Sequence, residues 1–386
     1  MTKSRVLILS FSELTRDPRV LRQIEIFAER YEVVTCGYGA APAGAADHIE
    51  IPVHLARWRK STAALAGLLG ARQYHRLYFG SERIALVRRE VLRRPPMDVV
   101  LANDVLAVPV AVELAPRAGV HADLHEFSPK QGEKAVWKAT IAPLMRWAVR
   151  RYVTRAASVT TVARGIAEEY RRTFGVAADV VPNATPYRPD LSPTPTSEPL
   201  RLVHAGAAGR GRRLEAMIDA VTRVNARTPG RLTFDLYLVA GDVRYIRELV
   251  ERAGDESVTG VAVREPVAFT ELVPTMHRYD IGIFVCPPTT FNLRHALPNK
   301  MFEFVQARLA LVVGPSPEMV DLVRAHDVGL VTDGFSAEEI AAALTALTPE
   351  AVDAYKAASH RAAEQLDARR LSEPWVRAID ALLAGD

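Results

Sequence analysis

The chain has 386 residues, more than one hydrophobic core usually organises, so two α/β domains are the first expectation. Its hydrophobic content of 49%, charged content of 24% and net charge of +4 are those of an ordinary globular protein. No segment approaches the roughly 20 apolar residues of a membrane span, and Cys36 and Cys286 lie far apart in apolar stretches, so a cytoplasmic protein without disulfides is expected.

The first half of the chain alternates between strand and helix patterns. The apolar run after the N-terminus is too short for a signal peptide and reads instead as a buried strand. Such alternation predicts a parallel, doubly wound sheet. The expected strands are 5–10, 31–36, 98–102, 120–124, 158–162 and 178–181, and the expected helices are 19–30, 107–114 and 166–174.

The segment 55–94 is strongly basic. It holds ten Lys and Arg residues against Glu82 and Glu90, a net charge of +8 that leaves −4 for the rest of the chain. Such a block can face an anionic membrane surface or an acidic acceptor, or it can be a solvated helical face. No helix-turn-helix, zinc-finger or RNA-binding pattern accompanies the charge, so no nucleic-acid partner is expected.

After residue 182 the composition becomes polar and rich in proline, which predicts a linker. The alternation then restarts and predicts a second α/β domain, followed by a helical end that carries Trp375. The expected strands are 202–205, 233–239, 258–263, 281–285, 310–313 and 329–331, and the expected helices are 214–224, 243–253, 269–276, 300–307, 317–325 and 337–347. The expected division is 1–184, a linker 185–199, 200–366, and a C-terminal helix 367–386 that crosses back to the first domain.

A glycine-rich turn lies between the first strand and first helix of the second domain. Its glycines, beginning at Gly206, follow the spacing GxxGxG rather than GxGxxG, and no Lys-Ser/Thr follows, so it is neither a dinucleotide loop nor a Walker loop. Arg210, Arg212 and Arg213 lie in it. Backbone N–H groups at a helix start and guanidinium groups suit a diphosphate. The alternative is a loop whose arginines are only solvated.

A second turn opens the helix expected from residue 300. Pro298 and Asn299 suit a helix start, but Lys300 in the first turn runs against the helix dipole. A phosphate at the same place explains such a cation. Glu303, one turn later, can accept hydrogen bonds from two ribose hydroxyls. The alternative is a surface helix with an i, i+3 Lys–Glu pair.

Polar residues also follow two strands of the first domain. His125 and Glu126 end one strand, and Asp104 ends another. Ligands bind at the carboxyl ends of parallel strands, so His125 can contact a sugar hydroxyl or a leaving phosphate. The alternative is a structural histidine.

The sequence motifs of several other enzyme classes are absent. The chain has no Asp-x-Asp, which disfavours a metal-dependent transferase, and no Cys/His cluster with zinc spacing. It also has no Gly-x-Ser-x-Gly elbow and no kinase signature.

In this order the motifs resemble the family-4 glycosyltransferases of the GT-B fold over nearly the whole chain. The segment 297–304, followed by Gly314 and Glu318, is the most specific match, to the family's "PxKxFE" block. The other matching segments are 17–20, 123–126, 161–167, 181–184, 206–213 and the helix that carries Trp375. The resemblance implies two Rossmann-like parallel-sheet domains facing across a cleft, a nucleotide-sugar donor and retention of anomeric configuration.

One position departs from the family. Its usual E-x7-E pair would place a Glu eight residues before Glu303, where this chain has His295. The resemblance therefore leaves the contacts to the donor sugar open, with His295 and Asn299 near that sugar.

The resulting expectation is a metal-independent glycosyltransferase without a cofactor, acting on a hydroxyl acceptor. The diphosphate is assigned to Gly206, Arg210, Arg212 and Lys300, the ribose to Glu303, and the catalytic role to His125. Ser12, Asp104 and Glu126 are the candidates on the acceptor side. The alternatives are a nucleotide-sugar epimerase of the same fold and a degenerate transferase that acts as a binding partner. The oligomeric state stays open.

Overall fold

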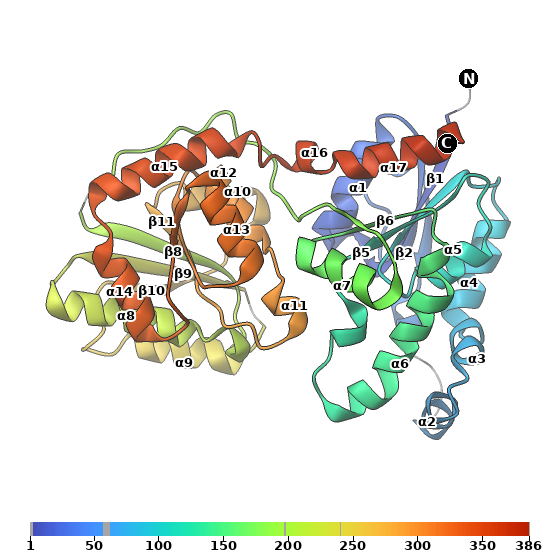
Figure 1. The fold of residues 1–386 in the computed structure, drawn as a ribbon, viewed down its shortest axis with the longest axis horizontal. Helices are drawn as coiled ribbons and strands as arrows, with labels where there is room; N and C mark the ends of the chain where they lie inside the picture. The colour runs from blue at the N-terminus through green and yellow to red at the C-terminus, as the bar shows by residue number, and fades with distance from the viewer. Residues whose placement is uncertain (1–2, 57–61, 197, 240, 386) are drawn as a thin grey trace. The chain divides into compact units, whose positions relative to one another are not determined.

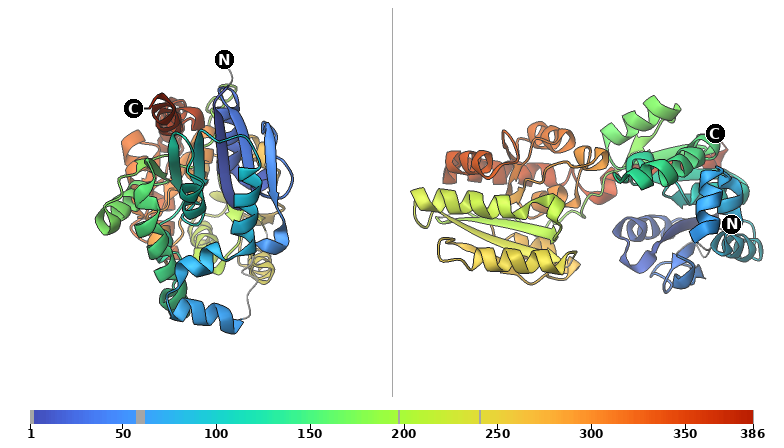
Figure 2. Two further views of the ribbon diagram at one scale, coloured as in Figure 1. Left: turned by 90° about the vertical axis from the view of Figure 1, so that its right-hand side faces the viewer. Right: turned by 90° about the horizontal axis from the view of Figure 1, so that it is seen from below.

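The computed structural model describes residues 3–56, 62–196, 198–239 and 241–385. The chain forms two compact units, and in each of them helices cover both faces of a parallel sheet (Figures 1 and 2). Unit 1 comprises Met1–Pro182, Thr290–Asn292 and Ser372–Asp386, and unit 2 comprises Asn183–Thr289 and Leu293–Leu371.

The sheet of unit 1 has the strand order β3-β2-β1-β4-β5-β6-β7, and every neighbouring pair in it is parallel. This is the order of a doubly wound Rossmann-like sheet, whose ligands bind at the carboxyl ends of the strands. The strands are β1 (Arg5–Glu13), β2 (Glu32–Tyr38), β3 (Asp47–Ile51), β4 (Val99–Asn103), β5 (Gly119–Leu124), β6 (Ser158–Thr161) and β7 (Asp179–Val180).

Alternate residues of the central strands face the two helical layers of unit 1. Leu7 and Leu9 of β1 pack with one layer, and Val6 and Ile8 pack with the other, which includes α17. The helices are α1 (Pro18–Ala28), α2 (Thr62–Gly70), α3 (Tyr74–Phe79), α4 (Glu82–Leu92), α5 (Val108–Glu113), α6 (Ala135–Arg151), α7 (Arg164–Phe174) and α17 (Glu373–Ala384).

Helix α1 begins with a strong N-terminal signal. The side chain of Asp17 accepts hydrogen bonds from the backbone N–H groups of Arg19 and Val20, and Pro18 occupies the first helical position. The start of the helix thereby places Arg19 beside Asp123, near the carboxyl end of β5.

The sheet of unit 2 has the order β10-β9-β8-β11-β12-β13, again with every neighbouring pair parallel. Its strands are β8 (Leu200–Ala207), β9 (Leu232–Val239), β10 (Val261–Arg264), β11 (Ile281–Phe284), β12 (Ala310–Val313) and β13 (Gly329–Val331). The helices are α8 (Leu214–Arg227), α9 (Val243–Ala253), α10 (Phe269–Met276), α12 (Asn299–Gln306), α13 (Pro317–His326), α14 (Ala337–Ala346), α15 (Pro349–Ala363) and α16 (Ala368–Leu371).

Residues 185–199, expected as a linker, cluster with unit 2. Part of this segment is held by Lys356 of α15, whose side chain is only 1% exposed. Its ammonium group donates to the Thr194 hydroxyl at 3.0 Å and pairs with Asp280 at 3.0 Å. A buried cation of this kind requires such partners, so the segment is anchored here.

The predicted fold class, two Rossmann-like parallel-sheet domains, is confirmed. The edge strand β3 was not predicted, and neither was the single-turn helix α11 (Phe291–Arg294), which lies where a loop was expected. Thr290, Phe291 and Asn292 cluster with unit 1, although the residues before and after this short stretch belong to unit 2.

Candidate active site

In unit 2 two basic side chains converge on Gly206, near the carboxyl end of β8. A Cβ atom at Gly206 would lie 3.0 Å from a guanidinium nitrogen of Arg212 and 3.6 Å from Cε of Lys300. The absence of a side chain at Gly206 therefore leaves room for the two cations to approach the same point. The structure thus brings together three of the four residues assigned to the diphosphate.

His204, two residues earlier on β8, was not predicted. Its side chain is fully buried, and Nδ1 donates a hydrogen bond to the Ile283 carbonyl at 2.9 Å. Burial, together with the positive charges of Arg212 and Lys300, lowers the pKa of His204 to about 4. Nε2 has no hydrogen-bond partner among the described residues and lies 3.8 Å from the position of a Gly206 Cβ. The sequence signal that could have identified His204 is its place in the predicted strand 202–205, two residues before Gly206.

Helix α12 fixes the position of Lys300. It begins after Pro298, and its apolar side anchors it because Phe304 packs over Gly282 of β11, where a Cβ atom would overlap the ring. The Lys300 ammonium donates to the Glu303 carboxylate at 2.5 Å, and the Glu303 side chain is only 2% exposed. The two predicted residues therefore form a largely buried ion pair.

His295 and Asn299 flank this part of unit 2. His295 Nδ1 lies 3.5 Å from a carboxylate oxygen of Glu318, in the first turn of α13. Asn299 is the first residue of α12, next to Lys300. At the position where the resembled family has a glutamate, this chain therefore has the imidazole of His295, which lies beside the carboxylate of Glu318.

Arg210 lies apart from the other cations. Its guanidinium forms two hydrogen bonds with Glu248, at 2.7 and 2.5 Å, and lies 5.2 Å from the ring centroid of Tyr245 on α9. It is also 3.5 Å from Asp242. The structure therefore does not bring Arg210 to the point where Arg212 and Lys300 meet.

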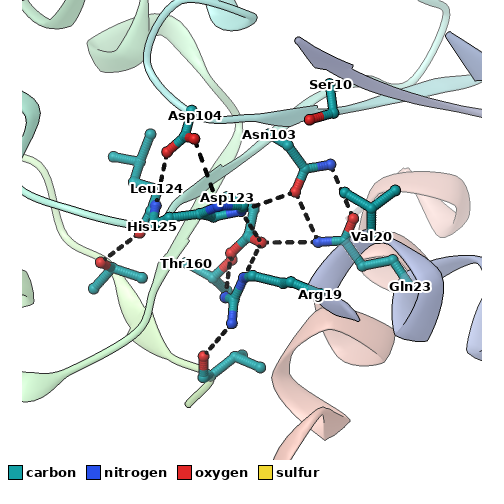
Figure 3. A network of polar contacts seen from close by, with 12 residues as sticks. Ser10, Arg19, Val20, Gln23, Asn103, Asp104, Asp123, Leu124, His125 and Thr160 are labelled. Atoms are coloured by element: carbon teal, nitrogen blue, oxygen red, sulfur yellow. Dashed lines mark hydrogen bonds and ion pairs between the residues drawn. The ribbon is translucent and has the colours of Figure 1, made fainter. Parts of the chain in front are cut away.

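In unit 1 a buried carboxylate organises the ends of β4, β5 and β6 (Figure 3). Asp123 is fully buried and accepts two hydrogen bonds from Arg19, both at 2.6 Å, and one from Gln23 at 2.8 Å. Thr160 donates to it at 2.7 Å, and the Trp375 indole at 3.3 Å. Burial alone would raise the pKa of Asp123, but Arg19 and His125 outweigh it and hold the pKa well below its ordinary value.

This network positions His125, which follows β5 (Figure 3). Nε2 of His125 lies 3.2 Å from the amide oxygen of Asn103 and 3.5 Å from Asp123, while Nδ1 lies 3.5 Å from Asp104. Burial opposes protonation, but the carboxylates of Asp104 and Asp123 outweigh it and raise the pKa of His125. The imidazole is therefore held between two carboxylates, with 22% of its side chain exposed.

Two of the three acceptor-side candidates line one cavity of about 260 Å³ in unit 1. Ser12 and Asp104 both contribute to its wall. Asp104 has a left-handed backbone (φ 66°), which is uncommon for a residue other than glycine. Glu126 is not among the lining residues; it accepts a hydrogen bond from Asn292, and burial raises its pKa.

The described residues contain no group of three or more His, Cys, Asp or Glu side chains that could hold a metal ion. None of the helices within the described ranges is both long and apolar enough to cross a membrane.

Structural comparison finds similar two-domain enzymes at low sequence identity. The α,α-trehalose 6-phosphate synthase of Burkholderia multivorans superposes with a TM-score of 0.69 at 13% identity, covering 100% of this chain and 99% of its own. The sucrose-phosphate synthase of Thermosynechococcus elongatus gives 0.68 at 12% identity, with 100% of both chains covered. Anabaena HepE, solved with UDP and glucose, gives 0.68 at 16% identity, covering 98% of this chain and 100% of its own. These similarities establish the fold.

Sequence comparison gives a match to a family model for the first half of the chain. Curated protein sequences gave no match. Residues 17–184, which include Arg19, Asp123 and His125, match the glycosyl transferase 4-like domain. The predicted resemblance to glycosyltransferases is thereby confirmed over residues 17–184, which are less than half of the chain, and the whole chain shares its two-domain fold with the solved structures above.

Proposed function

We propose that the chain transfers a glycosyl group from a nucleotide-diphosphate sugar to a hydroxyl acceptor, with unit 2 binding the donor and unit 1 the acceptor. The observation that carries the proposal is the convergence of Arg212 and Lys300 on Gly206. Two cations at one point match a diphosphate, and HepE, which has the same fold, was solved with UDP.

The chemistry follows from that charge. The bond between C1 of the sugar and the diphosphate oxygen breaks, and its electron pair leaves with the nucleoside diphosphate. The acceptor oxygen bonds to C1, and its proton leaves with the diphosphate. Arg212 and Lys300 stabilise the negative charge that develops on the leaving group, so no metal is required for this step. Retention of configuration is part of the proposal through the family resemblance.

The remaining groups have positioning roles. Glu303 accepts hydrogen bonds from the ribose hydroxyls, while His295 and Asn299 lie toward the donor sugar. His125, which Asp104 and Asp123 hold, contacts the reacting sugar. Because Arg210 is paired with Glu248, it is left out of the proposed diphosphate site.

The first test is nucleotide binding by thermal shift. At 100 times the dissociation constant, a nucleoside diphosphate should stabilise the wild-type protein by about 2.7 kcal/mol, because it binds only the folded state. Arg212→Gln should lose most of that shift. Arg227→Gln, which removes an exposed charge from the far end of α8, should keep it.

If no nucleoside diphosphate or nucleotide sugar raises the melting temperature of the wild-type protein, donor binding by unit 2 is wrong. Turnover of the donor must then be measured with and without acceptor. An epimerase consumes the nucleotide sugar alone, whereas the proposed transferase requires both substrates.

Cytoplasmic location and peripheral contact with the inner face of the membrane are also proposed, through the basic segment 55–94. Part of this charge is paired within the unit, since Arg93 contacts Glu90 and Arg94 contacts Asp47. Three further basic residues of the segment, Arg57, Arg59 and Lys60, lie outside the described residues. The exposed arginines that carry the proposal are Arg72, Arg76 and Arg88.

Co-sedimentation with phosphatidylglycerol-containing vesicles tests the membrane proposal. The double variant Arg72→Gln/Arg76→Gln should weaken binding by roughly 30-fold, because each basic residue near an anionic surface contributes about 1 kcal/mol. Binding should fall with added salt and be absent on neutral phosphatidylcholine vesicles. Equal sedimentation of the wild type with both vesicle types would exclude this contact.

A further inference from the structure

His204 of β8 is a buried titratable side chain that the proposed chemistry does not use. Its ring is fully buried and stacks on Phe284, with the ring centroids 5.8 Å apart. Nδ1 lies 2.9 Å from the Ile283 carbonyl oxygen, which only accepts hydrogen bonds, so Nδ1 carries the proton and Nε2 carries a lone pair. Because the pKa of His204 is lowered to about 4, the ring is uncharged at neutral pH. Nε2 is therefore a neutral acceptor in a fixed position.

This acceptor is unsatisfied. Nε2 of His204 is buried and has no hydrogen-bond partner among the residues that the structure describes. A buried acceptor without a donor lowers stability, so native proteins rarely keep one unless a ligand or a rearrangement supplies the donor. An ionised diphosphate oxygen is itself an acceptor and cannot supply it. A neighbouring side chain is therefore the first candidate.

Two side chains with unused donors adjoin His204 at Gly206. Nε2 lies 3.8 Å from the position of a Gly206 Cβ, while Cε of Lys300 and a guanidinium nitrogen of Arg212 lie 3.6 and 3.0 Å from the same point. An ammonium has three N–H donors, and Lys300 gives one of them to Glu303. Within the described ranges the other two have no protein acceptor, and the side chain of Arg212 forms no hydrogen bond or ion pair.

Of these two cations, Lys300 is the one that needs a second partner. Its ammonium donates to Glu303 at 2.5 Å, and that carboxylate cancels much of its charge. In the proposed function Glu303 binds the ribose and Lys300 stabilises the leaving diphosphate, so their pair must open. A neutral acceptor can then hold the ammonium without cancelling its charge. No carboxylate of the described residues competes in this way for Arg212.

We propose that His204 is a positioning residue for the donor: when a nucleotide-diphosphate sugar binds, Nε2 of His204 accepts a hydrogen bond from the Lys300 ammonium in place of Glu303. This inference rests on the proposed donor role of unit 2. Nζ is one bond beyond Cε, so rotation of the lysine side chain moves the ammonium from Glu303 toward His204. The imidazole then holds the ammonium, with its full charge, beside the diphosphate oxygens.

The test is isothermal titration with UDP, GDP and ADP, since a nucleoside diphosphate carries the charge of the leaving group. Two substitutions separate the two ring nitrogens: asparagine places an amide N–H near the position of Nδ1 only, and glutamine places an amide oxygen near the position of Nε2. His204→Asn should weaken binding of the nucleotide that the wild type prefers by roughly 10- to 100-fold, the range for a hydrogen bond to a charged group. His204→Gln should keep an affinity close to that of the wild type.

A double-variant cycle identifies the partner of His204. In a Lys300→Met background, His204→Asn should change the affinity little, because the donor of the hydrogen bond is already gone. In an Arg212→Gln background it should keep its full effect. An unchanged affinity in folded His204→Asn, equal losses in the Asn and Gln variants, or coupling to Arg212 instead of Lys300 would overturn the inference.

A second measurement needs no His204 variant and covers the case in which His204→Asn does not fold. In wild-type protein with nitrogen-15 histidine, saturation with the nucleotide should shift the Nε2 resonance of His204, and Lys300→Met should abolish most of that shift. A resonance that does not move in the wild type would overturn the inference. If no nucleoside diphosphate binds the wild type, the proposed donor role of unit 2 fails and this inference fails with it, whereas wild-type binding that is insensitive to His204 overturns this inference alone.

Discussion

Replacing Lys300 by methionine is expected to lower kcat/KM for the nucleotide-sugar donor by about 100- to 1,000-fold, the range measured when one preorganised group is removed from a charged transition state. Methionine keeps an unbranched chain of similar length and removes only the ammonium. The loss should fall mainly on kcat, because the charge on the diphosphate grows as the C1–O bond breaks. Steady-state kinetics with a saturating acceptor measures the effect.

Stability must be separated from chemistry in this variant. Glu303 has a side chain that is 2% exposed and pairs with Lys300, so its carboxylate would be left buried and unpaired. The double variant Lys300→Met/Glu303→Gln removes that charge and should recover most of the lost melting temperature without recovering kcat. Recovery of activity together with stability would show that Lys300 has only a structural role.

Arg210→Gln is the matched control within the same unit. It removes one guanidinium from the turn that also carries Arg212, but its ion pair with Glu248 is exposed and contributes little to stability. Donor kinetics should therefore stay close to those of the wild type. If Arg210→Gln matched Lys300→Met in its effect on kcat/KM, the proposed diphosphate site would be wrong.

The contrast between Arg210 and Arg212 marks where sequence reasoning ends. Both residues lie in the short 3-10 turn Arg210–Arg212, and nothing in the local pattern distinguishes them. Arg210 pairs with Glu248 of the distant helix α9, whereas Arg212 lies beside Gly206, which Lys300 of α12 also approaches. The sequence shows that the turn is basic. Which of its arginines can reach a ligand depends on the tertiary packing.

The alternation of strands and helices was predictable because its signal is local and repeated along the chain. Buried parallel strands are continuous apolar runs, and helices α9, α10 and the strands β12 and β13 lie at the predicted residues. The edge strand β3 was missed because only alternate positions in it are buried, so its apolar run is short. Arg83, a buried residue that lines the cavity of unit 1, was counted as one charge in a basic block, since burial of a long polar side chain leaves no periodic signal.

Asp123→Asn is expected to destabilise the protein by about 3–5 kcal/mol at neutral pH, the cost of breaking a buried ion pair by removing one partner. Arg19, whose side chain is 4% exposed, would lose the carboxylate that accepts two of its hydrogen bonds. The Trp375 indole of α17 donates to the same carboxylate and lies 4.6 Å from the Arg19 guanidinium. The C-terminal helix should therefore loosen from the sheet with the same substitution.

The pH dependence of this loss identifies its origin. Because the pKa of Asp123 is lowered in the folded state, its stabilisation is fully present above the unfolded pKa of about 3.9 and disappears as pH falls through the folded value. Urea unfolding of wild type and variant should thus give free energies that converge as the solution is acidified below that pH. Asp104→Asn makes the same chemical change at a side chain that is 52% exposed and should cost less than about 1 kcal/mol. It should still lower the pKa of His125, measurable by NMR titration, because Asp104 raises that pKa in the wild type. A difference between wild type and Asp123→Asn that stayed constant down to the acid limit of folding would mean that lost packing, rather than lost charge, causes the destabilisation.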